Sequence, residues 1–186
     1  MIIGLAGVAR SGKDTLADYL VDNHGFIKVA FADPMREALF RLSPRIQVNN
    51  GGYADLSTAV RMMGWERLKD YSPDVRALLQ RMGTEVGRDM FGENFWVDLA
   101  IKKALTAGSD VVISDVRYRN EAQSIEQTNG IVIKVERPGV VAANEHTSEH
   151  DLEGYPFLHT ILNEGTLDDL YSKMSTILEY EPSNFG

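Results

Sequence analysis

The 186-residue chain contains no cysteine. It therefore forms no disulfides and no thiolate metal sites, and nothing in its composition points to an oxidising compartment. Positive charge is also scarce, because 19 lysine and arginine residues stand against 27 aspartate and glutamate residues, for a formal net charge of −8. A negative field of this size argues against sequence-independent binding to DNA or to an anionic membrane surface. A small anionic substrate stays open, since a few local cations can outweigh the net charge.

Long hydrophobic runs are absent as well. The apolar stretch from Met1 to Ala9 is too short to span a bilayer and has no basic region before it, so we interpret it as a buried strand rather than a signal peptide. With 44% hydrophobic and 25% charged residues, the composition is that of an ordinary globular domain. We expect a cytoplasmic protein that binds neither nucleic acid nor membrane.

Short apolar runs alternate along the chain with segments of helical periodicity. This alternation predicts an α/β protein with three layers, in which a roughly five-stranded parallel sheet has helices on both faces. Strands are expected at Ile2 to Ala6, Phe26 to Phe31, Asp110 to Ser114, Ile131 to Glu136 and Thr160 to Leu162. Helices are expected from Lys13 to Asn23, from Asp33, from Ser72, from Phe95 to Thr106, from Arg119 to Thr128 and after Thr166.

The connection between the second and third predicted strands is longer than a crossover needs. We therefore expect a single domain over residues 1–186, with its core at 1–42 and 108–186 and a helical insert at about 43–107. A second, irregular segment at about 137–153 resembles a lid. Inserts beside the carboxyl edge of a parallel sheet are where ligands usually bind.

A glycine-rich segment follows the first predicted strand and opens the next helix. It reads Gly7-Val8-Ala9-Arg10-Ser11-Gly12-Lys13-Asp14-Thr15 and fits the pattern Gly-x4-Gly-Lys. In such a loop the backbone N–H groups and the helix N-terminus point at an anion, and Lys13 reaches the β- and γ-phosphates. We expect the segment to bind a nucleotide, with Gly7, Arg10, Ser11, Gly12, Lys13, Asp14 and Thr15 as its contacts. The alternative is a glycine-rich turn with an exposed lysine.

Asp14 is a departure from the usual pattern, which has serine or threonine at this position. A carboxylate beside a triphosphate is repelled unless Mg²⁺ lies between them, so Asp14 is a candidate to hold Mg²⁺ directly or through water. Thr15 is a second candidate for a metal or phosphate contact. The alternatives are a favourable anion in the first helical turn for Asp14, and an ordinary helix residue for Thr15.

The string from Arg10 to Thr15 resembles the P-loop of bacteriophage deoxynucleoside monophosphate kinases. Further strings match that family's pattern in the same order: Phe31-Ala32-Asp33-Pro34, Gln80 to Arg88, Asp115 to Glu121 and His146 to Glu149. The resemblance implies a P-loop kinase fold, with ATP and Mg²⁺ as cosubstrates and a deoxynucleotide as the small-molecule acceptor. It is also compatible with a homodimer, and with the host cytoplasm as location if a phage encodes the protein.

Phosphoryl transfer requires two anions to be held in line while their charge is neutralised. Arg81 and Arg88 are seven residues apart on a predicted helix and hence lie on nearly the same face. Gly83 and Gly87 between them would let a ligand approach the backbone. We expect this face, including Glu85, to bind the acceptor, because arginine forms bidentate hydrogen bonds with phosphate oxygens. The alternative is an exposed face on which Arg81 pairs with Glu85.

Two residues after the third predicted strand are expected to act beside the phosphates. Asp115 would hold the Mg²⁺ shell, and Arg117 would bridge the donor and acceptor phosphates as charge develops. Asn120 and Glu121, which follow them, are equally well explained as caps of the next helix. Asp33 after the second strand would orient the acceptor, or serve as an N-cap before Pro34.

The remaining candidates lie in loops. Arg137 resembles a lid arginine, with a solvated loop arginine as the alternative. Asn163 begins a loop where such folds often place adenine, with a plain connection as the alternative. His146 and His150 make a zinc site conceivable but disfavoured, so their role stays open. For the Phe95-Trp96 pair, core packing is favoured over base stacking.

Taken together, these features predict ATP- and Mg²⁺-dependent phosphoryl transfer to a deoxynucleoside 5′-monophosphate, giving the diphosphate and ADP. The near alternative is another P-loop metabolite kinase, such as a dephospho-coenzyme A kinase. The distant alternative is a nucleotide-binding switch without enzymatic activity.

Overall fold

A computed structural model of the chain describes residues 1–49, 51–140 and 151–181. The chain forms two compact units. The first, which we call the sheet unit, combines Met1–Phe31 with Ala100–Gly186, and the second, the helical unit, is Ala32–Leu99. Within the described residues, every helix is too short or too polar to serve as a membrane span.

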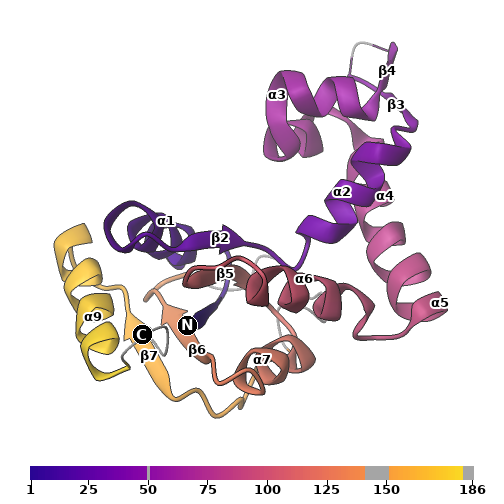
Figure 1. The fold of residues 1–186 in the computed structure, drawn as a ribbon. Coiled ribbons are helices and arrows are strands. Elements are labelled where there is room, and N and C mark those ends of the chain that lie inside the picture. The colour runs from indigo at the N-terminus through magenta and orange to yellow at the C-terminus, as the bar shows by residue number, and fades with distance from the viewer. Residues whose placement is uncertain (50, 141–150, 182–186) are drawn as a thin grey trace. The chain divides into compact units, whose positions relative to one another are not determined.

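The sheet unit is built on five parallel strands in the order β2-β5-β1-β6-β7 (Figure 1). This confirms the predicted sheet. The central strand β1 is buried at all of its positions, as its continuous apolar sequence requires. The strands are β1 (Ile2–Ala6), β2 (Ile27–Val29), β5 (Val111–Val116), β6 (Ile131–Glu136) and β7 (His159–Leu162).

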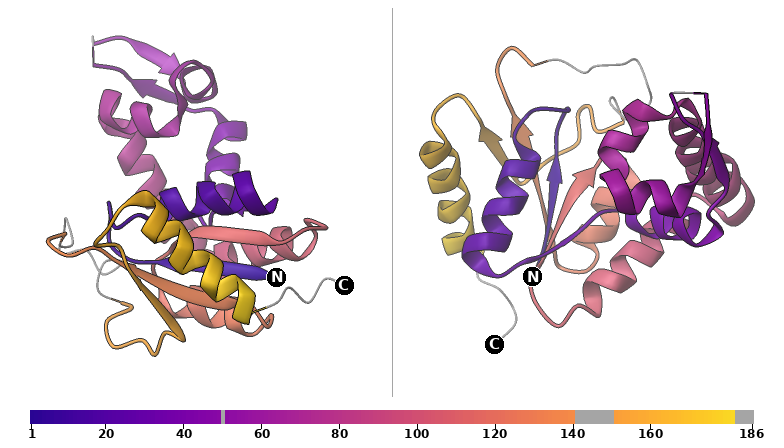
Figure 2. Two further views of the ribbon diagram at one scale, coloured as in Figure 1. Left: turned by 90° about the vertical axis from the view of Figure 1, so that its left-hand side faces the viewer. Right: turned by 90° about the horizontal axis from the view of Figure 1, so that it is seen from above.

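Helices cover both faces of this sheet, as predicted. The helices α1 (Lys13–His24) and α9 (Leu167–Tyr180) lie side by side on one face (Figure 2). The core there combines Leu16, Leu20, Leu170 and Met174 of these helices with Ile3, Leu5 and Ile133 of the strands. On the other face lies α7 (Arg119–Glu126), which packs closely because Gly4 has no side chain: a Cβ there would lie 2.6 Å from Ile125 Cδ1.

The helical unit has its own small core. It is formed by Leu39, Ile46, Leu56, Leu68 and Val75, with Ala59 among them. The elements are α2 (Asp33–Leu42), β3 (Arg45–Gln47), β4 (Tyr53–Asp55), α3 (Leu56–Tyr71), α4 (Pro73–Arg81), the π-helix η1 (Met82–Arg88), α5 (Asp89–Phe91) and the first part of α6 (Phe95–Leu105).

Three elements of this unit were not expected from the sequence. The strands β3 and β4 form an antiparallel hairpin, in a stretch where no strand was predicted. The helix α3 was missed because its periodicity is broken at Gly64, which has φ 74° and ψ 164° and joins two helical pieces across a kink. The lid-like segment expected at 137–153 is described only at 137–140 and 151–153, and His146 and His150 lie outside the described residues.

Candidate active site

The glycine-rich segment joins β1 directly to α1, and its path requires glycine at two positions. Gly7 has φ 141° and Gly12 has φ 111°, in the region that favours glycine. A Cβ at Gly7 would lie 2.3 Å from Val135 O, and a Cβ at Gly12 would lie 2.6 Å from Asn163 Nδ2. Gly12 is also the N-cap of α1 and has no side chain to cap it. A helix that begins without a side-chain cap is suited to bind an anion at its N-terminus.

Lys13 is folded back over the loop. Its Nζ donates hydrogen bonds to the carbonyl oxygens of Gly7, at 2.6 Å, and Val8, at 2.7 Å. The ammonium group is thus held against the loop backbone. A phosphate bound by the loop would offer charged acceptors in place of two neutral carbonyls, and charged acceptors form the stronger hydrogen bonds.

The tip of the loop is fixed from the β7–α9 connection. Asn163 Nδ2 donates to Ser11 O at 2.9 Å, and the backbone N–H of Asn163 donates to Glu136 O at 2.7 Å. Ser11 is fully buried, and its Oγ has no hydrogen-bond partner among the described residues. An unsatisfied buried hydroxyl is uncommon in folded proteins. Here it lies inside the loop that is predicted to receive phosphates.

Asp14 lies in the first turn of α1 and is largely exposed. Its Oδ1 is 3.6 Å from Nζ of Lys28 on β2, which also forms an ion pair of 2.8 Å with Asp18. Burial acts to lower the pKa of Lys28, but the hydrogen bond from Lys28 to Asp18 and the charges of Asp18 and Asp14 outweigh it and raise that pKa. Sequence reasoning missed Lys28, because only the fold brings β2 beside α1. Thr15, one residue on, is half-buried.

The strand next to the P-loop strand carries an irregularity. On β1 the register advances from Gly4 to Ala6, while on β5 it advances from Ile113 to Val116, so β5 contains one extra residue. Asp115 lies in this bulge, and its Oδ1 accepts a hydrogen bond from the backbone N–H of Phe31 at 2.8 Å. Bulges redirect side chains and are over-represented beside active sites. Asp115 therefore lies on the neighbouring strand, at the level where β1 ends.

The turn that follows β5 is held by a buried carboxylate. Glu121 is 5% exposed, and its Oε2 accepts hydrogen bonds from the backbone N–H groups of Arg117, at 2.7 Å, and Tyr118, at 3.0 Å. The capping alternative for Glu121 is therefore present in the structure. The same contact fixes the backbone from which the Arg117 side chain extends.

Two exposed arginines belong to the same end of the sheet. Arg10 lies within the P-loop and has φ 66°, and Arg137 directly follows β6, the other neighbour of β1. Because parallel strands end at one edge, both arginines lie at the carboxyl edge that carries the P-loop.

In the helical unit, Arg81 and Glu85 are both exposed, and Arg81 Nε is 3.2 Å from Glu85 Oε2. The pairing that sequence analysis gave as an alternative is thus present. The segment between Arg81 and Arg88 is a π-helix rather than an α-helix. Its wider coil turns less per residue, so a spacing of seven no longer places the two arginines on one face. In α2, the N-cap is Ala32, and Asp33 lies in the first turn instead.

Gly87 has a packing role that the sequence did not reveal. The buried indole of Trp96 fills the space beside Gly87, where a Cβ would lie only 1.8 Å from Nε1, and Nε1 donates to Gly83 O at 3.1 Å. At Gly83 a Cβ would lie 3.0 Å from Met35 Sδ. Gly87 therefore makes room for a core side chain. The core interpretation of Trp96 is confirmed.

Comparison with known proteins places the chain in a family. A sequence model described as deoxynucleotide monophosphate kinase matches residues 1–72 and 59–174. The chain belongs to the deoxynucleotide monophosphate kinase family.

Relatives of this family match over nearly their whole length. A protein of Acanthamoeba polyphaga mimivirus, provisionally named a deoxynucleotide monophosphate kinase, is 32% identical over 96% of each chain. The deoxynucleotide monophosphate kinase of Escherichia phage RB69 is 26% identical over 95% of this chain and 99% of its own. Among solved structures, TT1252 of Thermus thermophilus superposes with a TM-score of 0.50 at 18% identity, over 99% of this chain and 98% of that one, and this likeness concerns the fold alone.

Membership of the deoxynucleotide monophosphate kinase family makes the chain a nucleotide kinase, in agreement with its P-loop. The match extends through both compact units, so the helical unit is a part of the family's structure and not an addition to it. The match also includes the strings on which the resemblance was based, from Gly7 in the loop to Glu149.

Proposed function

We propose that this protein transfers the γ-phosphoryl group of ATP to the 5′-phosphate of a deoxynucleoside monophosphate in the presence of Mg²⁺, giving ADP and the deoxynucleoside diphosphate. One observation carries the proposal. In a member of this kinase family, the P-loop holds the Lys13 ammonium against its own backbone, and Asp115 lies on the adjacent strand.

The P-loop binds the donor. The N–H groups of the loop and of the α1 N-terminus bind phosphate oxygens, and Lys13 exchanges the carbonyls of Gly7 and Val8 for the β- and γ-phosphates. The Ser11 hydroxyl gains an acceptor inside the loop. Arg10 and Arg137 add positive charge at the same sheet edge, and Asn163 holds the loop in shape through Ser11 O.

The residues beside the loop fit a magnesium ion that binds together with the nucleotide. Mg²⁺ usually takes one or two protein carboxylates, with waters and phosphate oxygens completing its shell. Asp115 and Asp14 are two such carboxylates, and Thr15 adds a hydroxyl; among the described residues no three acidic or histidine side chains form a metal site alone. Asp115, Asp14 and Thr15 would hold the ion directly or through water. When bound, the ion neutralises phosphate charge and fixes phosphate geometry.

The helical unit binds the acceptor in this proposal. Either Arg88 or Arg81, which the π-helix places on different faces, binds its 5′-phosphate, and Glu85 orients Arg81 through their existing contact. Asp33 orients the sugar. Arg117 of the sheet unit, whose backbone Glu121 holds in place, stabilises the charge that develops between the two phosphates.

The test is ADP release from ATP and Mg²⁺ with a single acceptor in each reaction. The acceptors are the deoxynucleoside and ribonucleoside 5′-monophosphates and dephospho-coenzyme A, with a reaction lacking acceptor as the blank. We expect turnover with one or more deoxynucleotides and its loss when a chelator removes Mg²⁺. Turnover with dephospho-coenzyme A alone would replace the proposed acceptor, and ATP binding without turnover on any acceptor would contradict the proposed reaction.

A further inference from the structure

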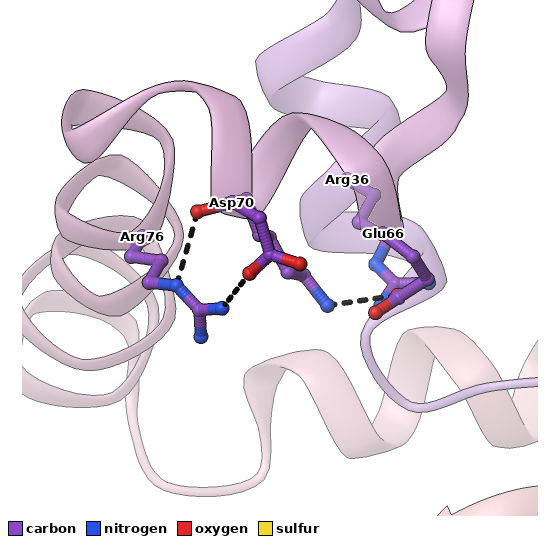
Figure 3. Close-up of polar contacts among 5 residues, drawn as sticks. Arg36, Glu66, Asp70 and Arg76 are labelled. Carbon is purple, nitrogen blue, oxygen red and sulfur yellow. Dashed lines mark hydrogen bonds and ion pairs between the residues drawn. The ribbon is translucent and has the colours of Figure 1, made fainter. Parts of the chain in front are cut away.

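Ion pairs join neighbouring elements in both units. In the helical unit, Arg76 of α4 contacts Asp70 of α3 and links the two helices (Figure 3). In the sheet unit, Lys28 of β2 contacts two carboxylates of α1, those of Asp14 and Asp18. The contacts of Lys28 are of a different kind, because Asp14 belongs to the P-loop segment and is a candidate for the magnesium shell.

The two carboxylates hold Lys28 unequally. Lys28 Nζ donates a hydrogen bond of 2.8 Å to Asp18 Oδ1, whereas it lies 3.6 Å from Asp14 Oδ1, beyond the range of a hydrogen bond. Asp18 therefore anchors the ammonium group, and Asp14 interacts with it through charge alone. The side chain of Asp14 is also 82% exposed, so solvent screens this interaction and Asp14 can leave Lys28 at little cost.

A structural role for Lys28 is easily stated. Asp14 and Asp18 are four residues apart on α1, and like charges at this spacing repel each other and destabilise a helix. Lys28 relieves that repulsion. This role alone leaves unexplained why a carboxylate occupies a P-loop position where serine or threonine is usual, since the charge of Asp14 repels a triphosphate whenever no cation lies beside it.

We propose that Lys28 is a positioning residue of the kinase site, which neutralises Asp14 until Asp14 joins a magnesium shell. The inference rests on the proposed function and adds to it a residue that acts through Asp14. With ATP alone in the loop, Lys28 offsets the negative charge that Asp14 directs at the phosphates. With Mg²⁺ also bound, Asp14 takes part in the metal shell, directly or through water, and Lys28 remains bound to Asp18.

The arrangement of the elements suits this exchange. Lys28 comes from β2, whereas both aspartates come from α1, so the ammonium group stays in place through Asp18 when Asp14 leaves it. Lysine also suits the task better than arginine. Its ammonium is a compact point charge, which can hydrogen-bond one carboxylate and act on a second at longer range, whereas the planar fork of arginine favours a single carboxylate.

The consequence is that Lys28 reduces the dependence of ATP affinity on Mg²⁺. Without Mg²⁺, loss of the ammonium group leaves the charge of Asp14 facing the phosphates, and ATP binds more weakly. With Mg²⁺, the ion neutralises Asp14, so the same loss has little effect. A purely structural role predicts an equal change under both conditions, because the repulsion between Asp14 and Asp18 is then relieved for the sake of α1 alone.

The test compares ATP binding with and without Mg²⁺. Calorimetric titration of the full chain with ATP, in Mg²⁺ and separately in a chelator, measures both Kd values without requiring turnover. Lys28→Met should weaken ATP binding about three- to tenfold in the chelator and less than about twofold in Mg²⁺. Lys28→Arg keeps the positive charge and should retain both wild-type Kd values. If Lys28→Met does not fold, Lys28→Gln takes its place.

The partner of Lys28 provides the reverse change in charge. Asp14→Asn should tighten ATP binding in the chelator, because it removes the carboxylate that repels the phosphates. In the double variant Asp14→Asn/Lys28→Met, the loss caused by Lys28→Met should largely disappear, since no charge at position 14 remains to be neutralised. The difference between the single and double variants measures the coupling between the two side chains.

The matched control is Lys102→Met. Lys102 is exposed in the last turn of α6, which leads to the start of β5, whereas the P-loop follows the end of β1. Since β1 and β5 are parallel, the two positions belong to opposite edges of the sheet. The substitution removes the same charge from the sheet unit, and we expect both Kd values to be unchanged.

The outcomes separate the role of Lys28 from the proposed reaction. Unchanged Kd values in Lys28→Met, or an equal loss in Mg²⁺ and in the chelator, would show a structural ion pair and overturn the role, while wild-type turnover upholds the reaction. A loss confined to the chelator, in a protein without turnover on any deoxynucleotide, would support the role and contradict the reaction. A loss that persists in the double variant or appears in Lys102→Met would overturn the role, as would a wild-type protein that binds no ATP in the chelator.

Discussion

Asp115 offers a substitution pair that separates its charge from its hydrogen bond. In the structure, Asp115 Oδ1 accepts from the N–H of Phe31 at 2.8 Å. Asparagine retains an oxygen acceptor at this position but removes the negative charge, whereas alanine removes both. If the carboxylate charge serves the magnesium shell, the two variants should be similarly inactive and differ in stability.

The magnitudes follow from the surroundings of this side chain. Asp115→Ala leaves the Phe31 N–H without its charged acceptor, which costs about 1–2 kcal/mol in free energy of unfolding at a half-buried site. For a chain of this length that corresponds to about 2–4 °C in thermal midpoint for each kcal/mol. Asp115→Asn should remain within about 0.5 kcal/mol of the wild type. Both variants should lose about 10- to 100-fold in kcat, the range typical of residues that order a metal shell.

The measurement combines denaturant unfolding with kinetics at several Mg²⁺ concentrations. A raised Mg²⁺ requirement in Asp115→Asn, at unchanged stability, would assign the effect to the charge. Wild-type kcat in Asp115→Asn would refute the metal role and leave Asp115 as a structural acceptor for the β2 terminus. Equal stability of Asp115→Ala and Asp115→Asn would refute the reasoning about the hydrogen bond.

Three further outcomes are expected. Lys13→Ala should abolish turnover in a folded protein, because Lys13 neutralises phosphate charge; near-normal kcat with an unchanged circular dichroism spectrum would reject this role. Arg88→Ala should raise KM for the monophosphate more than KM for ATP, and equal increases would argue against acceptor binding. Gly87→Ala should lower the free energy of unfolding by about 1–3 kcal/mol, because its Cβ would lie 1.8 Å from Trp96 Nε1; unchanged stability in denaturant would contradict the close packing seen here.

Local sequence was sufficient for most of the sheet unit. Continuous apolar runs identified the strands, and Thr166 marked the start of α9, where Thr166 and Asp169 form the reciprocal hydrogen bonds of a capping box. These features depend on residues that are close together in the chain, so they can be predicted from the sequence alone. The same holds for Gly7 and Gly12, whose backbone angles only glycine adopts readily.

The helical unit was less accessible to this approach. The kink at Gly64 interrupts the period by which α3 would have been recognised. The π-helix between Arg81 and Arg88 changes which residues share a face. The spacing of hydrophobic residues in the sequence does not predict such a π-helix. Gly87 was assigned to a ligand because Trp96, which needs the space beside it, follows later in the chain.

The sequence by itself determined the fold class, the P-loop and the family resemblance, because each is encoded in short contiguous strings. Only the tertiary structure decided the contacts that complete the site. Asn163 supports Ser11 across 152 positions, and Asp115 holds Phe31 across 84, in a bulge that arises from the pairing of two strands. Such contacts follow from the order in which the strands assemble, and no local pattern of residues specifies that order.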